Sequence, residues 1–343
     1  MNPFIYTALP VRVIFGRGKV AETAAEARRL GIRRPLVITT PHQAESAAGI
    51  VKETEGVGFA GAAMHTPVAV TEKAMAVLKA AGCDGTIALG GGSSTGLGKA
   101  IALRTDLPQL VIPTSYAGSE MTNILGETAD GAKVTKRDHK IQPESVIYDP
   151  DLLGTLPPLF AATSGMNAIA HAVEGLYAAD GNPIISLMAV EGIRALASAL
   201  PKAKAGQDEA LYGAWLCGAV LGSAAMALHH KLCHVLGGTF DLPHAETHTV
   251  ILPHATAYNA PAAEEAMRRI AQVLGTASAA QGLFDLAQKL GAPLALRDIG
   301  MPESGLDRAA DIAVANPYPN PRNLERGAIR QLLDDAFHGR RPL

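Results

Sequence analysis

The sequence predicts two domains, an N-terminal α/β domain built on a parallel sheet and a C-terminal domain made of helices. Three observations lead to this fold class. The chain has 343 residues, about twice the length of a typical domain. Its first 150 residues alternate short β-branched runs with Ala-rich helical segments. After Leu156-Pro157-Pro158 the β-branched runs become scarce, so the predicted domains are residues 1–157 and 158–343.

In the first domain, predicted strands alternate with predicted helices through short loops. This order is typical of a parallel sheet that helices cover on both faces. The first helix is expected to end at Gly31, since glycine adopts the left-handed backbone found at helix ends. The predicted strands are residues 11–15, 35–39, 57–59, 85–89 and 110–113, and the predicted helices are 19–30, 44–54 and 71–81.

The composition excludes several classes of protein. Apolar residues make up 48% of the chain and charged residues 18%, which excludes a disordered chain. A formal charge of −2 leaves no basic excess for nucleic acid. The three cysteines are widely spaced and predict no disulfide framework, and nothing resembles a signal peptide, so we expect a cytoplasmic protein. The uncharged stretch 211–228 contains three glycines and predicts a buried helix, not a membrane span.

A glycine-rich turn follows the predicted strand at 85–89. Gly90-Gly91-Gly92-Ser93 leads into a helix-forming segment, so unpaired backbone N–H groups and the positive end of a helix would face a ligand. We interpret the turn as a cradle in which Gly91, Gly92 and Ser93 hold a pyrophosphate. The alternative is a tight turn without a ligand. The spacing matches neither the usual dinucleotide fingerprint nor a P-loop.

Hydroxyl side chains follow the next predicted strand. Thr114, Ser115 and Ser119 come after the strand at 110–113, where hydroxyls can bind the ribose, phosphate or amide of a cofactor. Serine and threonine are also ordinary turn and N-cap residues, and this alternative stays open.

Histidines gather in the second domain, where six of the eleven lie between residues 229 and 254. His230 and His234 are four apart and share a helical face, as do Asn167 and His171 upstream. Two helices could therefore direct three or four imidazoles, including His244, toward one point. This predicts metal binding or proton transfer, the alternative for any one histidine being a satisfied core or surface position. The default position for the active site is the cleft between the domains.

At these residues the sequence resembles the iron-containing (group III) alcohol dehydrogenase family over nearly the whole chain. The similarity lies in the Gly-Gly-Gly-Ser turn, the Pro-Thr…Gly-Ser-Glu-x-Thr loop, the Asp-Pro before Leu-Pro-Pro, the helix with His171 and the histidine-rich segment. The resemblance implies a dehydroquinate synthase-like architecture with a Rossmann-like dinucleotide-binding domain. It implies that a bound metal would use Asn167, His171, His230 and His244, that His234 lies near the substrate, and that Thr114, Ser119 and Lys133 lie near the ribose and nicotinamide.

Two positions depart from the family pattern. Asn167 replaces an aspartate ligand, and Gly96 stands where many members have aspartate. A neutral amide lowers the affinity for a hard cation, so we expect no bound metal. With the segments 115–120 and 315–322, these departures resemble the maleylacetate reductase branch. Its members use NADH or NADPH to reduce the carbon–carbon double bond of maleylacetate to 3-oxoadipate in the bacterial degradation of resorcinol-type and chlorinated aromatics.

The resemblance implies hydride addition to a double bond conjugated to a ketone. The developing enolate oxygen then needs hydrogen-bond donors. We expect His171, His230 and His244 to line this pocket, with His234 or His244 as donor or proton source; the sequence leaves the choice between them open.

Substrate and cofactor selectivity give three further expectations. The two carboxylates of the substrate need cations, and Arg322 and Lys231 are the candidates, each with the alternative of an ordinary surface charge or helix cap. Thr40 follows the strand at 35–39, where NAD-selective enzymes often carry an acid. Since no acid is present to repel a 2′-phosphate, we expect relaxed choice between NADH and NADPH.

The apolar, Ala-rich helices predict a homodimer.

Two other enzyme classes remain as alternatives. One is a metal-dependent alcohol or polyol dehydrogenase in which the amide oxygen of Asn167 binds the metal. The other is a lyase related to dehydroquinate synthase, which uses NAD only transiently. A binding module without catalysis is not expected, because a phosphate cradle and a histidine cluster in separate domains suggest a reaction between them.

Overall fold

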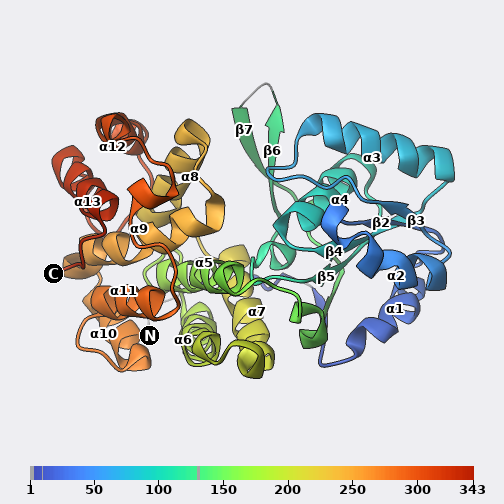
Figure 1. The fold of residues 1–343 in the computed structure, drawn as a ribbon, viewed down its shortest axis with the longest axis horizontal. Coiled ribbons are helices and arrows are strands. Elements are labelled where there is room, and N and C mark those ends of the chain that lie inside the picture. Colours follow the sequence, from blue (N-terminus) through green and yellow to red (C-terminus); the bar gives the residue numbers. More distant parts are fainter. Residues whose placement is uncertain (1–3, 10, 130–131) are drawn as a thin grey trace. The chain divides into compact units, whose positions relative to one another are not determined.

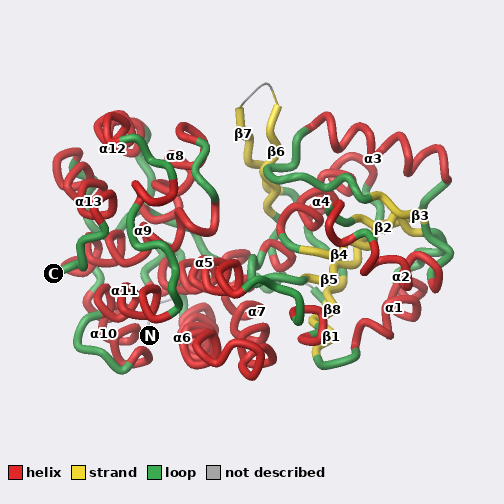
Figure 2. Tube along the Cα trace, in the orientation of Figure 1, coloured by secondary structure: helices red, strands yellow, loops and turns green. Residues whose placement is uncertain are grey.

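The computed structural model describes residues 4–9, 11–129 and 132–343, without the side chains of residues 129, 132 and 133. The described chain forms two compact units (Figure 1). One is Ala8–Leu156 and the other is residues 157–343 with residues 4–7. The described strands all belong to the first unit, and the second consists of helices joined by loops (Figure 2). The predicted fold class, an α/β part followed by a helical part, is therefore confirmed.

The first unit is built on a six-stranded sheet in which all neighbouring strands run parallel. The strand order is β1-β8-β5-β4-β2-β3, so the chain leaves β2 for the outer strand β3 and returns to β4 on the other side of β2. Open parallel sheets bind ligands at such a reversal, beyond the carboxyl ends of the strands. The strands are β1 Arg12–Phe15, β2 Pro35–Ile38, β3 Val57–Phe59, β4 Gly85–Gly90, β5 Gln109–Pro113 and β8 Ser145–Tyr148.

Helices cover both faces of this sheet, as the alternating pattern predicts. Alternate side chains of each strand point to opposite faces. Ile87 and Leu89 of β4 pack with α1 and α2, whereas Leu36 and Ile38 of β2 pack with α3 and α4. The predictions missed β8 and a separate antiparallel hairpin. The bounds are α1 Thr23–Arg29, α2 Ala48–Glu53, α3 Val68–Ala81, α4 Gly92–Thr105, and for the hairpin β6 Ile124–Ala129 and β7 Ala132–Arg137.

The second unit surrounds one long helix. Residues 162–175 of α5 are all buried, and α5 contacts α6, α7 and α9. A second apolar core lies between α8, α9, α12 and α13. The helices are α5 Pro158–Leu176, α6 Pro183–Ala199, α7 Gln207–Ser223, α8 Leu228–Phe240, α9 His244–Asn259, α10 Glu264–Leu274, α11 Ala279–Lys289, α12 Leu306–Ala315 and α13 Arg326–His338.

The predicted single helix over 211–228 is wrong at its end. Ala224 has an extended backbone (φ −126°, ψ 149°), so α7 ends at Ser223 and the histidine segment begins a new helix. A longer stretch, Pro183–Ser223, is apolar and long enough to cross a membrane by length and composition alone. Ala203 (φ 50°, ψ −124°) interrupts it between α6 and α7, which pack against each other and against α5.

Candidate functional site

The glycine turn joins β4 to α4. Gly90 has φ +144°, which glycine adopts readily, and a Cβ there would lie 2.4 Å from Oγ of Ser94. Gly91 is the N-cap of α4 and offers no side chain to its first-turn N–H groups. An added Cβ at Gly92 would meet no atom within 4 Å, and Ser93 is half-buried. The turn therefore offers backbone N–H groups and open space, as an anion site requires.

A hydrogen-bond chain connects the loops after β2 and β5. Nε2 of Gln43 donates to Oγ1 of Thr114 (2.7 Å), and Oγ1 of Thr40 donates to Oε1 of Gln43 (3.3 Å). The backbone N–H of Thr114 also donates to the carbonyl of Gly90 at 3.0 Å. Gln43 was not among the predicted site residues. A glutamine can accept and donate at once, and only the sheet order brings it between the two threonines.

The remaining predicted cofactor residues follow the same edge. Ser115 is buried, and its Oγ would lie 2.9 Å from a Cβ added to Gly91. Ser119 begins a short 3-10 helix, Ser119–Met121, where its Oγ lies 3.3 Å from Nζ of Lys99. Lys133 belongs to β7, and its side chain lies outside the described residues. The described residues Thr40, Gly91, Gly92, Ser93, Thr114, Ser115 and Ser119 thus follow the adjacent strands β2, β4 and β5.

The structure explains the glycine at position 96. A Cβ added to Gly96 would lie 2.4 Å from Oγ1 of Thr66, a buried residue with φ 45°. Backbone in the left-handed region holds Thr66 against the helix. The aspartate that many family members have at this position would therefore displace Thr66.

The predicted histidines come from three helices, although the sequence predicted two. Asn167 and His171 lie on α5, His230 and His234 lie on α8, and His244 is the first residue of α9. The ring centroids of His171 and His230 are 5.2 Å apart, and those of His230 and His234 are 6.4 Å apart. His171 and His230 are buried, whereas His234 and His244 are exposed. The cluster has a buried floor and an accessible rim.

Glu174 anchors this floor and was given no role in the sequence analysis. It lies one turn after His171 on α5 and has no exposed surface. Its Oε2 lies 2.7 Å from Nδ1 of His230 and accepts from the backbone N–H of Ala227 (2.8 Å), and its Oε1 accepts from the N–H of His229 (2.8 Å). Three donors thus converge on one carboxylate, which caps the start of α8 and orients His230.

A deeper layer of side chains supports the cluster. His248 lies one turn after His244 on α9, with ring centroids 4.3 Å apart, and 5.0 Å from the ring of His230. Its Nδ1 lies 3.0 Å from Nε2 of His229, which in turn lies 3.7 Å from Sγ of Cys233. The i,i+4 spacing of His244 and His248 was a signal that could have added His248 to the predicted set.

Burial keeps these side chains neutral. It lowers the pKa values of His171, His229 and His248 well below the usual range, and neighbouring imidazoles lower them further. Burial also raises the pKa of the Cys233 thiol, and the nearby charge of Glu174 raises it further. His171, His229 and His248 are therefore neutral imidazoles, and the Cys233 thiol is protonated.

The donor set that the resemblance implies, Asn167 with three histidines, contains no carboxylate. Asn167 is 4% exposed, and its Oδ1 has no hydrogen-bond partner among the described residues. An amide oxygen supplies no charge to a hard cation, and the imidazoles supply none either. Among the described His, Cys, Asp and Glu side chains, the group whose ligand atoms come within 4.8 Å is His229, Cys233 and His248. This is not the ligand set that the resemblance implies.

Both predicted carboxylate-binding cations pack against tyrosines. The guanidinium carbon of Arg322 lies 4.3 Å from the ring centroid of Tyr258, and its Nη1 donates to the carbonyl of Tyr258 at 3.2 Å. Nζ of Lys231 lies 5.7 Å from the ring centroid of Tyr318. Both cations are half-buried, and stacking holds Arg322 in one orientation.

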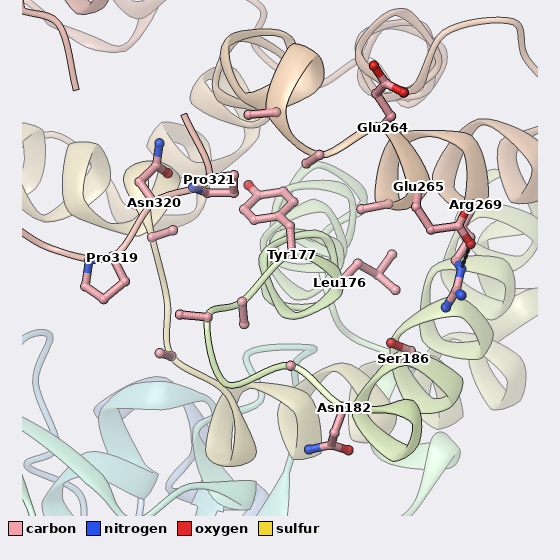
Figure 3. A pocket seen from close by; sticks show the side chains of 18 residues that line it. Leu176, Tyr177, Asn182, Ser186, Glu264, Glu265, Arg269, Pro319, Asn320 and Pro321 are labelled. Atoms are coloured by element: carbon pink, nitrogen blue, oxygen red, sulfur yellow. Dashed lines mark hydrogen bonds and ion pairs between the residues drawn. The ribbon is translucent and has the colours of Figure 1, made fainter. Parts of the chain in front are cut away.

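A pocket of about 620 Å³ lies at the carboxyl end of α5 (Figure 3). Tyr177 and Asn320 face it together with Asn182 and Ser186. Ala227, whose N–H donates to Glu174, is also part of its wall. The predicted catalytic histidines His171, His230, His234 and His244 are not among its lining residues.

Comparison with known proteins identifies the family. A model described as iron-containing alcohol dehydrogenase matches residues 10–150, and the C-terminal model of the Fe-containing alcohol dehydrogenase family matches residues 161–337. The chain is 54% identical to the maleylacetate reductase of Burkholderia cepacia over 100% of both chains. It is also 54% identical to that of Sphingobium indicum over 99% of both. The crystal structure of maleylacetate reductase from Agrobacterium tumefaciens matches with a TM-score of 0.96 at 53% identity, covering 100% of both chains.

Matches of this length cover the glycine turn and the histidine helices alike. The chain therefore belongs to the iron-containing alcohol dehydrogenase family.

Proposed function

We propose that this protein is a maleylacetate reductase that uses NADH or NADPH. The observation that carries the proposal is the 54% identity, over the full length of both chains, to a relative with that name. Asn167, which stands in place of a charged metal ligand, supports the proposal. In the proposed reaction no alcohol has to be polarised by a metal. The pathway would be the bacterial degradation of resorcinol-type and chlorinated aromatics, in the cytoplasm.

The reaction transfers a hydride and a proton. Hydride from the reduced nicotinamide adds to the alkene carbon β to the ketone, and the electrons of the double bond move to the ketone oxygen as an enolate. A proton then adds to the α carbon as the enolate returns to the ketone. One NADH or NADPH and one proton are consumed for each 3-oxoadipate formed, and the oxidised cofactor leaves.

The loops after β2, β4 and β5 would bind the cofactor. In the proposal the glycine turn holds the pyrophosphate through backbone N–H groups. Hydroxyls of the neighbouring loops bind the ribose and nicotinamide. Because position 40 is a threonine and not an acid, no negative charge repels the 2′-phosphate of NADPH, and the enzyme accepts either cofactor. The residues involved are Thr40, Gly91, Gly92, Ser93, Thr114, Ser115, Ser119 and Lys133.

The histidine cluster would bind the reacting part of the substrate. In the proposal His171, His230 and His244 line the pocket around the enolate oxygen, and imidazole N–H groups of His171 and His244 stabilise its charge. Glu174 accepts a hydrogen bond from Nδ1 of His230, at a distance of 2.7 Å, and so fixes the orientation of that ring. His234 or His244 delivers the proton, since both are exposed at the rim and can exchange protons with water.

Two cations would bind the substrate carboxylates. The proposal assigns this role to Arg322 and Lys231, whose orientations are restricted by Tyr258 and Tyr318. No step is assigned to a metal. A metal-dependent alcohol dehydrogenase is not favoured, because the relatives at 50–54% identity are maleylacetate reductases. The proposal includes a homodimer as the working assembly.

The test follows the absorbance of NADH with freshly generated maleylacetate, with and without EDTA. We expect rapid oxidation that the chelator does not change, and a similar result with NADPH. Failure to oxidise either cofactor would overturn the proposed activity. Oxidation that EDTA abolishes and added Fe²⁺ or Zn²⁺ restores would overturn the metal-free part.

A further inference from the structure

A buried lysine connects the glycine turn to the loop after β5. Lys99 lies on α4, seven residues after its first residue Gly92, and has no exposed surface. Its Nζ donates to the carbonyl of Ser119, to Oγ1 of Thr122 (2.9 Å) and to the carbonyl of Ile124 (3.0 Å), with Oγ of Ser119 at 3.3 Å. Among the described residues, the hydrogen-bond acceptors of this ammonium all belong to residues 119–124.

Burying an ammonium costs free energy, because the charge loses its hydration. Burial lowers the pKa of Lys99 to about 7, and the nearby charge of Glu120 offsets part of this effect. Glu120 is itself buried and accepts from the hydroxyl of Tyr148 at 2.8 Å. Methionine or leucine would pack in the same space without the cost of removing a charge from water. The ammonium therefore has the role of holding the surrounding loop through hydrogen bonds.

The loop is the one that bears the predicted cofactor hydroxyls. Ser119 starts the 3-10 helix after Gly118, whose φ is 79°. The carbonyl of Ser119 also accepts from the N–H of Thr122 (3.2 Å) and from Oγ1 of Thr122 (3.1 Å), so the segment forms a closed turn around the lysine. Without the ammonium, the carbonyls of Ser119 and Ile124 and the hydroxyls of Ser119 and Thr122 lose a donor. None of the other hydrogen bonds named here ties the turn to α4.

We propose that Lys99 is a positioning residue for the nicotinamide cofactor, which holds Ser119 at the place where its hydroxyl meets a cofactor bound to the glycine turn. The inference rests on the proposed function for the identity of the cofactor. Lys99 itself touches no cofactor atom in this proposal and acts through Ser119. A displacement of a positioning group by about 1 Å can lower a reaction rate about 10²-fold, so small movements of the turn matter.

The test measures NADH affinity of the full-length protein by fluorescence titration without substrate. The variants are Lys99→Met and Ser119→Ala, singly and together, with Lys79→Met as the control, because Lys79 is exposed on α3 of the same unit. We expect Lys99→Met to weaken NADH binding about 10- to 100-fold, the loss expected when a hydrogen bond to the cofactor is removed. The double variant should bind no more weakly than Ser119→Ala alone, since both changes remove the same contact.

A rescue experiment separates positioning from loss of the fold. In Lys99→Ala, methylammonium can occupy the vacated space and donate to the same oxygens, so it should restore NADH affinity. It should not do so in Lys99→Met, where a side chain fills that space. Wild-type affinity in folded Lys99→Met, additive effects in the double variant, or no rescue of folded Lys99→Ala would each overturn the inference. If the wild-type protein binds neither NADH nor NADPH, the proposed function fails first.

Discussion

Nδ1 of His230 lies 2.7 Å from Oε2 of Glu174, a carboxylate with no exposed surface. The same carboxylate accepts two backbone N–H groups at the start of α8, so it fixes both the helix and the ring. The Nε2 of this ring is buried and has no described hydrogen-bond partner. A histidine held in this way keeps one nitrogen directed toward a ligand.

Glu174→Gln should therefore reduce turnover. The amide N–H₂ of glutamine would face N–H groups that need an acceptor, which leaves at least one of them unpaired in the core. We expect kcat to fall about 10- to 100-fold with little change in NADH affinity. Steady-state kinetics and NADH titration check this, with Glu264→Gln, an exposed residue on α10, as the control. Unchanged kcat in a folded variant would show that His230 needs no orienting carboxylate.

The exposed rim of the cluster should supply the proton. His244→Ala and His234→Ala are expected to leave NADH binding intact, and the one that removes the proton donor should lower kcat about 10²-fold. The control is His139→Ala, an exposed histidine of the first unit. Stopped-flow measurement of NADH oxidation separates the chemical step from product release. Loss of NADH binding in either variant would contradict a role at the substrate.

Two neighbouring glycines should respond differently to alanine. Gly90→Ala forces a side chain into φ +144° and to 2.4 Å from Oγ of Ser94, so we expect a loss of about 1–3 kcal/mol of stability as well as of NADH binding. Gly92→Ala meets no atom within 4 Å and should preserve stability. If a pyrophosphate occupies that open space, Gly92→Ala should still weaken NADH binding. Thermal unfolding and NADH titration give both quantities, and wild-type NADH affinity in Gly92→Ala would place the phosphates elsewhere.

His254 should make the fold sensitive to acid. Burial lowers its pKa from 6.5 to about 4, although the charge of Asp335 acts in the opposite direction. The unfolded chain therefore takes up this proton first, so the free energy of unfolding should fall as the pH drops from about 6.5 to about 4, by up to roughly 3 kcal/mol. Urea titrations across this range should show a shallower pH dependence for His254→Gln, and none of that change for the exposed His139→Gln. Equal slopes for wild type and His254→Gln would contradict the prediction.

The sequence alone determined what depends on local pattern. Period and turn residues predicted the strand at 57–59 with its observed bounds and the glycine turn at its observed place between strand and helix. The resemblance led to the family, and the Asn167 substitution led to the expected branch, because both depend on residue identity and not on distance. The missed hairpin of β6 and β7 is polar and half exposed, so hydrophobic periodicity gave no signal for it.

Only the tertiary structure decided which side chains meet. Glu174 and Gln43 have no unusual sequence context, and each becomes part of a site because a distant element supplies its partner: α8 for Glu174 and the loop after β5 for Gln43. His248 had a signal in its spacing from His244, but its partner His229 also comes from α8. Lys99 is a further case, since the sequence analysis assigned it no role, whereas packing removes it from water. The packing of whole elements decides which distant side chains form hydrogen bonds and which become buried. The spacing of residues along one element therefore does not predict either.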